Sequence, residues 1–128
     1  MIILDTSVMV EIADESEKGI KLESYISKTE ESFAITVFTV HELLLPTTGQ
    51  EKAKLEEKLS EYKILAFDYE SSLESVSLNN QLKNKGAMLS KIDLFISSIC
   101  KAEGASLLTL DSDFKRVPGL KVITMQDL

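Results

Sequence analysis

Short apolar runs alternate along the chain with longer amphipathic segments. Each run has the length, and most the polar boundaries, of a strand buried on both faces of a sheet. The runs cover residues 1–4, 33–36, 64–67, 106–110 and 120–123. The pattern therefore predicts four to five short strands, separated by segments long enough to be helices.

Helices are predicted where apolar residues recur every three or four positions. The clearest pattern is Ile92, Phe95, Ile96 and Ile99, which follows Ser90 and precedes Gly104. Ser90 with Asp93, and Thr39 with Glu42, have the spacing of capping boxes, which begin helices. Further helices are predicted around residues 8–12, 20–26, 39–45, 51–62 and 71–84.

Strands that alternate with helices through short connections indicate crossover units. Such units build a parallel sheet with helices on both faces. The sequence thus predicts an α/β fold, a three-layer α/β/α sandwich around a central parallel sheet of four to five strands. Because no repeat or linker interrupts the 128 residues, we expect a single domain over residues 1–128.

Acidic residues outnumber basic ones by 21 to 14, which gives a formal charge of −7. This balance excludes a domain that binds nucleic acid through bulk positive charge. No apolar run approaches the roughly 18 residues that span a bilayer, and the N-terminus lacks the pattern of a signal peptide. We therefore expect a cytoplasmic protein without a membrane anchor, whose single cysteine, Cys100, is a buried thiol.

Five acidic residues stand where a parallel sheet places its ligands. Asp5 follows the first strand, Glu42 and Asp93 lie in first helical turns, and Asp111 and Asp113 follow the fourth strand. The carboxyl ends of parallel strands form one edge, where open α/β sheets bind ligands. Several carboxylates there would repel one another unless cations neutralised them. Their joint placement predicts a site for Mg²⁺, which prefers oxygen ligands.

Each acid also has a purely structural explanation. Glu42 and Asp93 hold the third position of their capping boxes, and Asp5, Asp111 and Asp113 suit caps or turns. Capping does not explain why every one of these acids falls at the same sheet edge. A zinc-protease helix is excluded because Leu45 stands where the second histidine should be, and no glycine-rich phosphate loop is present.

The order of these motifs resembles that of the PIN domain family. The resemblance runs from Ile3-Leu4-Asp5-Thr6-Ser7, through Thr39-x-x-Glu42 and Lys91-Ile92-Asp93, to Leu108-Thr109-Leu110-Asp111-Ser112-Asp113-Phe114. It covers nearly the whole chain, and the size is similar to that of the VapC-type toxins of toxin–antitoxin pairs.

The resemblance implies a ribonuclease that uses Mg²⁺ or Mn²⁺. Asp5, Glu42, Asp93 and Asp111 would be the catalytic acids and would hold the metal. Asp113 remains an alternative to Asp111 as the fourth ligand, and Asp111 is preferred because it is nearer the strand end. Ser7 and Thr109 match polar positions that form hydrogen bonds within the site, and Lys91 is a candidate for substrate binding.

The implied partners are an RNA substrate, an antitoxin protein and a second copy of the chain in a homodimer, to which the helix at 51–62 would contribute. Basic residues near the last two acid motifs either guide the RNA or form a solvated helix face; they are Lys83, Lys85, Lys91, Lys115 and Arg116. Two alternatives to a toxin are a housekeeping RNA-processing nuclease and a non-catalytic PIN scaffold that binds protein or RNA.

Overall fold

A computed structural model describes all 128 residues and contains one five-stranded sheet in the order β3-β2-β1-β4-β5. Every strand pair is parallel. The strands are β1 (Ile2–Leu4), β2 (Phe33–Thr36), β3 (Lys63–Leu65), β4 (Ser106–Leu108) and β5 (Val122–Ile123). The predicted parallel sheet is confirmed with five strands, each within the predicted run or one residue from it.

Six α-helices connect the strands, and two short 3₁₀ helices lie near the C-terminus. The α-helices are α1 (Thr6–Ala13), α2 (Glu17–Lys28), α3 (Val37–Leu44), α4 (Gly49–Leu59), α5 (Tyr69–Asn84) and α6 (Lys91–Glu103). The 3₁₀ helices are η1 (Ser112–Arg116) and η2 (Met125–Asp127). All six α-helices were predicted from the apolar periodicity, whereas η1 and η2 were not, because segments this short carry no periodic pattern.

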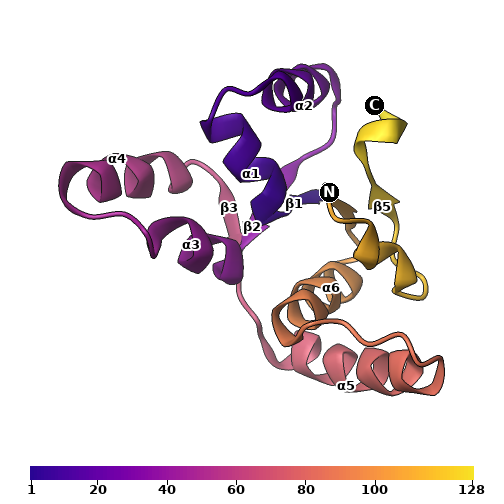
Figure 1. The fold of residues 1–128 in the computed structure, drawn as a ribbon. Coiled ribbons are helices and arrows are strands. Elements are labelled where there is room, and N and C mark those ends of the chain that lie inside the picture. Colours follow the sequence, from indigo (N-terminus) through magenta and orange to yellow (C-terminus); the bar gives the residue numbers. More distant parts are fainter.

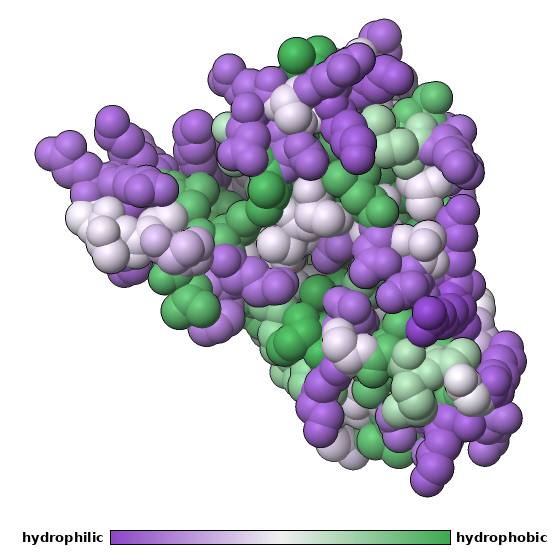
Figure 2. Space-filling model, in the orientation of Figure 1, coloured by the Kyte–Doolittle hydropathy of each residue, from purple (hydrophilic) through white to green (hydrophobic).

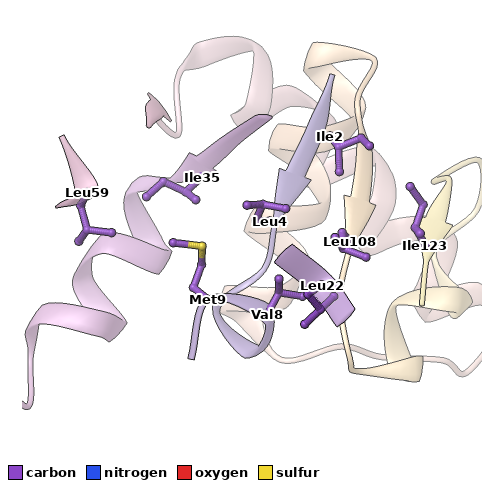
Figure 3. Close-up of a cluster of buried hydrophobic side chains, with 9 residues drawn as sticks. All are labelled: Ile2, Leu4, Val8, Met9, Leu22, Ile35, Leu59, Leu108 and Ile123. Carbon is purple, nitrogen blue, oxygen red and sulfur yellow. The ribbon is translucent and has the colours of Figure 1, made fainter. Parts of the chain in front are cut away.

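The sheet lies between two layers of helices, with α1 and α2 on one side and α5 and α6 on the other (Figure 1). Successive residues of a strand point to opposite faces. Ile2 and Leu4 accordingly join a core cluster with side chains of α1, α2 and α4 (Figure 3), while Ile3 packs against Ile96 and Ile99 of α6. The predicted α/β/α sandwich is therefore confirmed.

The strand order reverses between β1 and β4. From β1 the chain proceeds through β2 to β3 on one side, and β4 and β5 are added on the other side. Such a reversal opens a crevice at the carboxyl ends of the two central strands, because their connections leave in opposite directions. Asp5 follows β1 and Thr109 follows β4, so both stand at this switch point.

One predicted helix start is wrong. Thr36, the last residue of β2, is the N-cap of α3, and its side chain accepts a hydrogen bond from the Thr39 amide at 3.3 Å. The extended backbone of the strand end already has the geometry of an N-cap residue. The helix therefore begins before Thr39, which leaves Glu42 in the second turn, outside any capping box.

On the face of the molecule drawn in Figure 2, hydrophilic side chains (purple) surround smaller apolar patches (green). Several apolar side chains are nevertheless exposed, among them Ile20, Leu45 and the α5 residues Tyr69, Leu73 and Val76. None of the helices combines the length and the apolar character that crossing a bilayer requires.

Candidate active site

Asp5 lies at the centre of the switch point and is 7% exposed. It is the N-cap residue of α1, but its side chain makes no capping hydrogen bond. Instead, the hydroxyls of Thr109 and Ser7 donate to its Oδ2 at 2.7 and 3.0 Å. Burial raises the pKa of Asp5, and these two hydrogen bonds oppose the rise without cancelling it. A buried carboxylate held by a side chain of α1 and by the residue that follows β4 thus points to a role other than capping.

Ser7 also links the two segments that follow β1 and β4. Its hydroxyl accepts a hydrogen bond from the Leu110 amide at 3.1 Å, and the Asp111 amide donates to the Thr109 hydroxyl at 3.0 Å. The sequence placed Ser7 and Thr109 among the site residues, and the structure brings both to Asp5.

Glu42 reaches the same crevice from α3. Its Oε1 accepts a hydrogen bond from the Thr6 hydroxyl at 2.8 Å, and that hydroxyl is also 2.9 Å from the hydroxyl of Thr39. Since Glu42 is not part of a cap, its structural explanation as a helix-starting residue no longer holds. Thr6 was missed by the sequence analysis, although its place directly after Asp5 was visible there.

Asp93 stands in the first turn of α6. The N-cap of this helix is Ser90, as predicted, and its hydroxyl accepts from the Asp93 amide at 3.2 Å. The reciprocal bond, which the Ser90 amide would donate to the Asp93 carboxylate, is absent, so the capping box is half formed. The Asp93 carboxylate is partly buried and interacts with the Ser90 hydroxyl rather than with the Ser90 amide. The neighbouring Lys91 is exposed and forms no ion pair.

Asp111 and Asp113 differ in their surroundings. Asp111 is partly buried and caps η1, because its Oδ1 accepts from the Asp113 amide at 2.9 Å. Asp113 has a side chain 52% exposed and paired with Arg116 at 3.2 Å. The geometry thus distinguishes two residues that the sequence left as alternatives, with Asp111 toward the crevice and Asp113 on the outer surface.

The four acids Asp5, Glu42, Asp93 and Asp111, named here the carboxylate site, lie close enough to affect one another electrostatically. Burial is the main cause that raises the pKa of Asp93, and the Ser90 hydroxyl opposes it. The negative charges of the other three acids raise the pKa of Asp93 further. The four acids therefore act on one another through their charges.

The carboxylate site does not form a metal-binding cluster by itself. No three His, Cys, Asp or Glu side chains lie close enough together to hold an ion. Its donors are carboxylate oxygens, the type that Mg²⁺ prefers, and Mg²⁺ commonly takes only one or two protein carboxylates together with several waters. The donor type therefore suits a hydrated divalent cation.

Three aromatic rings support the helices that carry Glu42 and Asp93. Phe38 of α3 lies 5.7 Å from Phe95 of α6, and Phe67, which follows β3, lies 4.4 Å from Phe95 between ring centroids. Such aromatic pairs add specific packing energy beyond the area they bury. They hold α3 and α6 together below the carboxylate site. Sequence spacing gave no indication of this cluster because its members come from three separate elements.

The model of the PIN domain family matches residues 2–120. No protein with curated functional information matches the chain. Among solved structures, VapBC2 from Rickettsia felis, bound to a promoter DNA fragment, contains a chain 27% identical to this one with a TM-score of 0.81. That alignment covers 97% of this chain and 98% of the other.

Two further solved structures share the fold at lower identity. VapBC-1 from nontypeable Haemophilus influenzae matches at 20% identity with a TM-score of 0.83, over 97% of this chain and 98% of the other. FitAcB from Neisseria gonorrhoeae matches at 22% identity with a TM-score of 0.82 and covers both chains completely, at 100% each. The family match spans the first four strands, all six α-helices and the whole carboxylate site, and the chain belongs to the PIN domain family.

Proposed function

We propose that this PIN domain is a metal-dependent endoribonuclease that hydrolyses RNA phosphodiesters at the carboxylate site. The observation that carries the proposal is the electrostatic convergence of Asp5, Glu42, Asp93 and Asp111 at the switch point of the sheet. Asp5 is buried, and Asp93 and Asp111 are partly buried. Carboxylates in such places that repel one another destabilise a fold unless a cation neutralises them. Their presence together favours a catalytic role over a structural one.

The acids would hold Mg²⁺ or Mn²⁺ through oxygen atoms that the protein leaves free. The hydroxyls of Ser7 and Thr109 both donate to Oδ2 of Asp5, and Thr6 donates to Oε1 of Glu42. The second oxygen of each carboxylate therefore has no side-chain donor. A divalent cation bound there supplies a water of lowered pKa and neutralises the charge of the scissile phosphate.

The protein's own groups position the reacting partners. Ser7 and Thr109 orient the Asp5 carboxylate, and Thr6 orients Glu42, so that little reorganisation is needed when RNA binds. Asp111 is our choice for the fourth acid, because Asp113 is already engaged by Arg116.

The proposed physiological role is that of the toxin in a toxin–antitoxin pair. The similarity to chains from VapBC complexes supports this role, and an antitoxin would be the protein partner. Exposed apolar side chains such as Ile20 and Leu45 offer contact area for such a partner. A housekeeping RNA-processing nuclease and a non-catalytic scaffold are the alternatives. The retained set of four acids argues against the scaffold.

Cleavage assays test the nuclease proposal. The purified protein is incubated with structured and single-stranded RNA in Mg²⁺, in Mn²⁺ and in EDTA, beside D5N, D93N and the exposed control D14N. We expect cation-dependent cleavage that D5N and D93N abolish and that D14N retains. Equal cleavage by the wild type and D5N would overturn the proposed site.

Expression in a bacterial host tests the toxin role. We expect growth arrest by the wild type, normal growth with D93N, and rescue by the product of an adjacent small gene. Normal growth with an active wild-type nuclease would favour the housekeeping alternative. Homodimerisation, with or without α4 at the interface, stays a prediction that the mass of the protein in solution tests.

A further inference from the structure

A pocket of about 260 Å³ adjoins the carboxylate site. Leu110 and Ser112, which flank Asp111 in the sequence, form one wall, and Lys18 at the start of α2 and Lys115 of η1 contribute two others. The remaining wall is the C-terminal segment around η2. This lysine pocket therefore joins the start of α2 to two segments near the C-terminus, about 90 positions further along the chain.

The lining of the lysine pocket is cationic in a protein of formal charge −7. Lys18 and Lys115 line it, and no carboxylate does. Neither lysine belongs to any of the three ion pairs in the structure. The Asp127 carboxylate accepts from the Thr124 amide and hydroxyl, and the charge of Lys115 contributes to the lowered pKa of Asp127. The ammonium groups of Lys18 and Lys115, neither of which is in an ion pair, thus line the same pocket.

The other lining groups suit a small polar anion. Ser112, Thr124 and Gln126 provide hydroxyl and amide groups, and the apolar lining is limited to Leu110 and Met125. Sites for drug-like molecules are larger and mainly apolar, with volumes of about 300–1,000 Å³. A phosphate, with its three or four acceptor oxygens, matches this pocket better than an apolar ligand does.

The pocket is held in a fixed position relative to the carboxylate site. The Leu110 amide donates to Ser7, whose own hydroxyl donates to Asp5. Asp111 caps the 3₁₀ helix that carries Lys115. An anion in the pocket would consequently lie beside Asp111 and outside the carboxylate site itself.

We propose that the lysine pocket binds a backbone phosphate of the RNA adjacent to the scissile one. This inference rests on the proposed ribonuclease function and adds a binding subsite to it. The protein as a whole is acidic, so its net charge does not attract RNA. The two lysines of the pocket would provide the local positive charge that binds the RNA backbone. Lys115 belongs to the basic residues noted in the sequence; Lys18, nearly 100 positions away, joins it only in the fold.

The test compares K18A/K115A with the matched double variant K28A/K63A. Lys28 and Lys63 are also exposed and unpaired, but they precede or begin strands at the opposite edge of the sheet. Both doubles change the net charge by the same amount. For K18A/K115A we expect KM for single-stranded RNA to rise about tenfold at low salt with kcat unchanged, and the slope of log KM against log salt to fall by roughly 1. We expect K28A/K63A to stay within about twofold of the wild type in KM.

A binding measurement separates the failure of this inference from the failure of the nuclease proposal. Amide chemical shifts of Ser112, Thr124 and Gln126 are followed in D93N with Mg²⁺ as a short single-stranded RNA is added, and in parallel with inorganic phosphate. We expect RNA to shift all three amides, and K18A/K115A in the same background to lose the shifts.

Two results would overturn the inference even if the wild type cleaves RNA. One is an equal KM for the two double variants. The other is a response of the three amides to inorganic phosphate but not to RNA, which would make the pocket a site for the free anion. If the wild type does not cleave RNA, the nuclease proposal fails. The chemical shifts alone then show whether the lysine pocket binds RNA.

Discussion

Thr6 illustrates how a single hydroxyl connects two elements of the site. It begins α1 directly after Asp5, yet its side chain contacts Glu42 and Thr39 of α3. The sequence identified Asp5 and Glu42 because acids at strand ends and helix starts follow known patterns. It did not identify Thr6, since a threonine at a helix start has many equivalent uses and the partner lies 36 positions away.

Replacing Thr6 tests its positioning role. We expect T6V to lower kcat for RNA about tenfold, because Glu42 loses the hydrogen bond that orients it. We expect T6S, which keeps the hydroxyl, to retain kcat, and both variants to have melting temperatures close to that of the wild type. Steady-state kinetics and thermal unfolding measure these effects; equal kcat values for T6V and T6S would contradict the role.

The raised pKa of Asp5 has a consequence for stability. Because the pKa is higher in the folded than in the unfolded protein, the folded state binds the proton more tightly. The stabilising contribution is therefore complete below the unfolded pKa and is lost as pH rises through the folded pKa. At neutral pH without a cation, the charged Asp5 destabilises the fold.

Neutralising Asp5 should reverse this effect. In EDTA at pH 7 we expect D5N to raise Tm by about 3 °C, the shift that roughly 1 kcal/mol produces in a domain of this size. Its amide oxygen still accepts from Ser7 and Thr109. At pH 3, where Asp5 of the wild type is protonated, we expect D5N and the wild type to have the same Tm. A lower Tm for D5N than for the wild type at pH 7 would contradict the electrostatic explanation.

At the scale of elements, the sequence predicted which segments form strands and helices more accurately than where they begin. Apolar runs and periodicity depend on burial, which the sheet and helix layers impose along a whole segment. Boundaries depend on single hydrogen bonds, as Thr36 shows by capping α3 in place of Thr39. The same limit left two interpretations of Asp93, as part of a cap or as part of the site; in the structure its capping box is half formed.

The cap of α6 gives a prediction at this scale. We expect S90A to lower stability by about 1 kcal/mol, the usual effect of removing an N-cap. Because Ser90 also fixes the helix start that carries Asp93, S90A should raise the Mg²⁺ concentration needed for half-maximal cleavage. The control is D68A, which removes the N-cap of α5, a helix without site residues. If S90A and D68A have the same Mg²⁺ requirement, Ser90 acts on stability alone.

For the whole molecule, the parallel topology explains why the site assembles where it does. The reversal between β1 and β4 brings Asp5 and Thr109 together, although 104 positions separate them. Apolar patterning does not reveal the order of the strands in the sheet. The sequence therefore predicted that the acids share one edge, but it did not predict which strands are adjacent or that the lysine pocket forms. The resemblance to the PIN family supplied the acid set that periodicity alone left open.

The reactivity of the Cys100 thiol measures how often the core of the fold opens. Its thiol is buried at 0% exposure, and burial raises its pKa to about 12. Since the thiolate is the reactive form, we expect iodoacetamide at pH 8 to modify the native protein about a thousandfold more slowly than the urea-unfolded chain. Fast stoichiometric labelling of the native protein, followed by mass spectrometry, would show that the core around α6 opens readily.

Titration with Mn²⁺, followed by calorimetry, tests the four-carboxylate site most directly. D111N and D113N form a matched pair, because each removes one charge from the same short segment. We expect saturable binding to the wild type, binding about tenfold weaker or worse for D5N, D93N and D111N, and wild-type affinity for D113N. Absence of saturable binding to the wild type, or a loss in D113N as large as in D111N, would contradict the site as described.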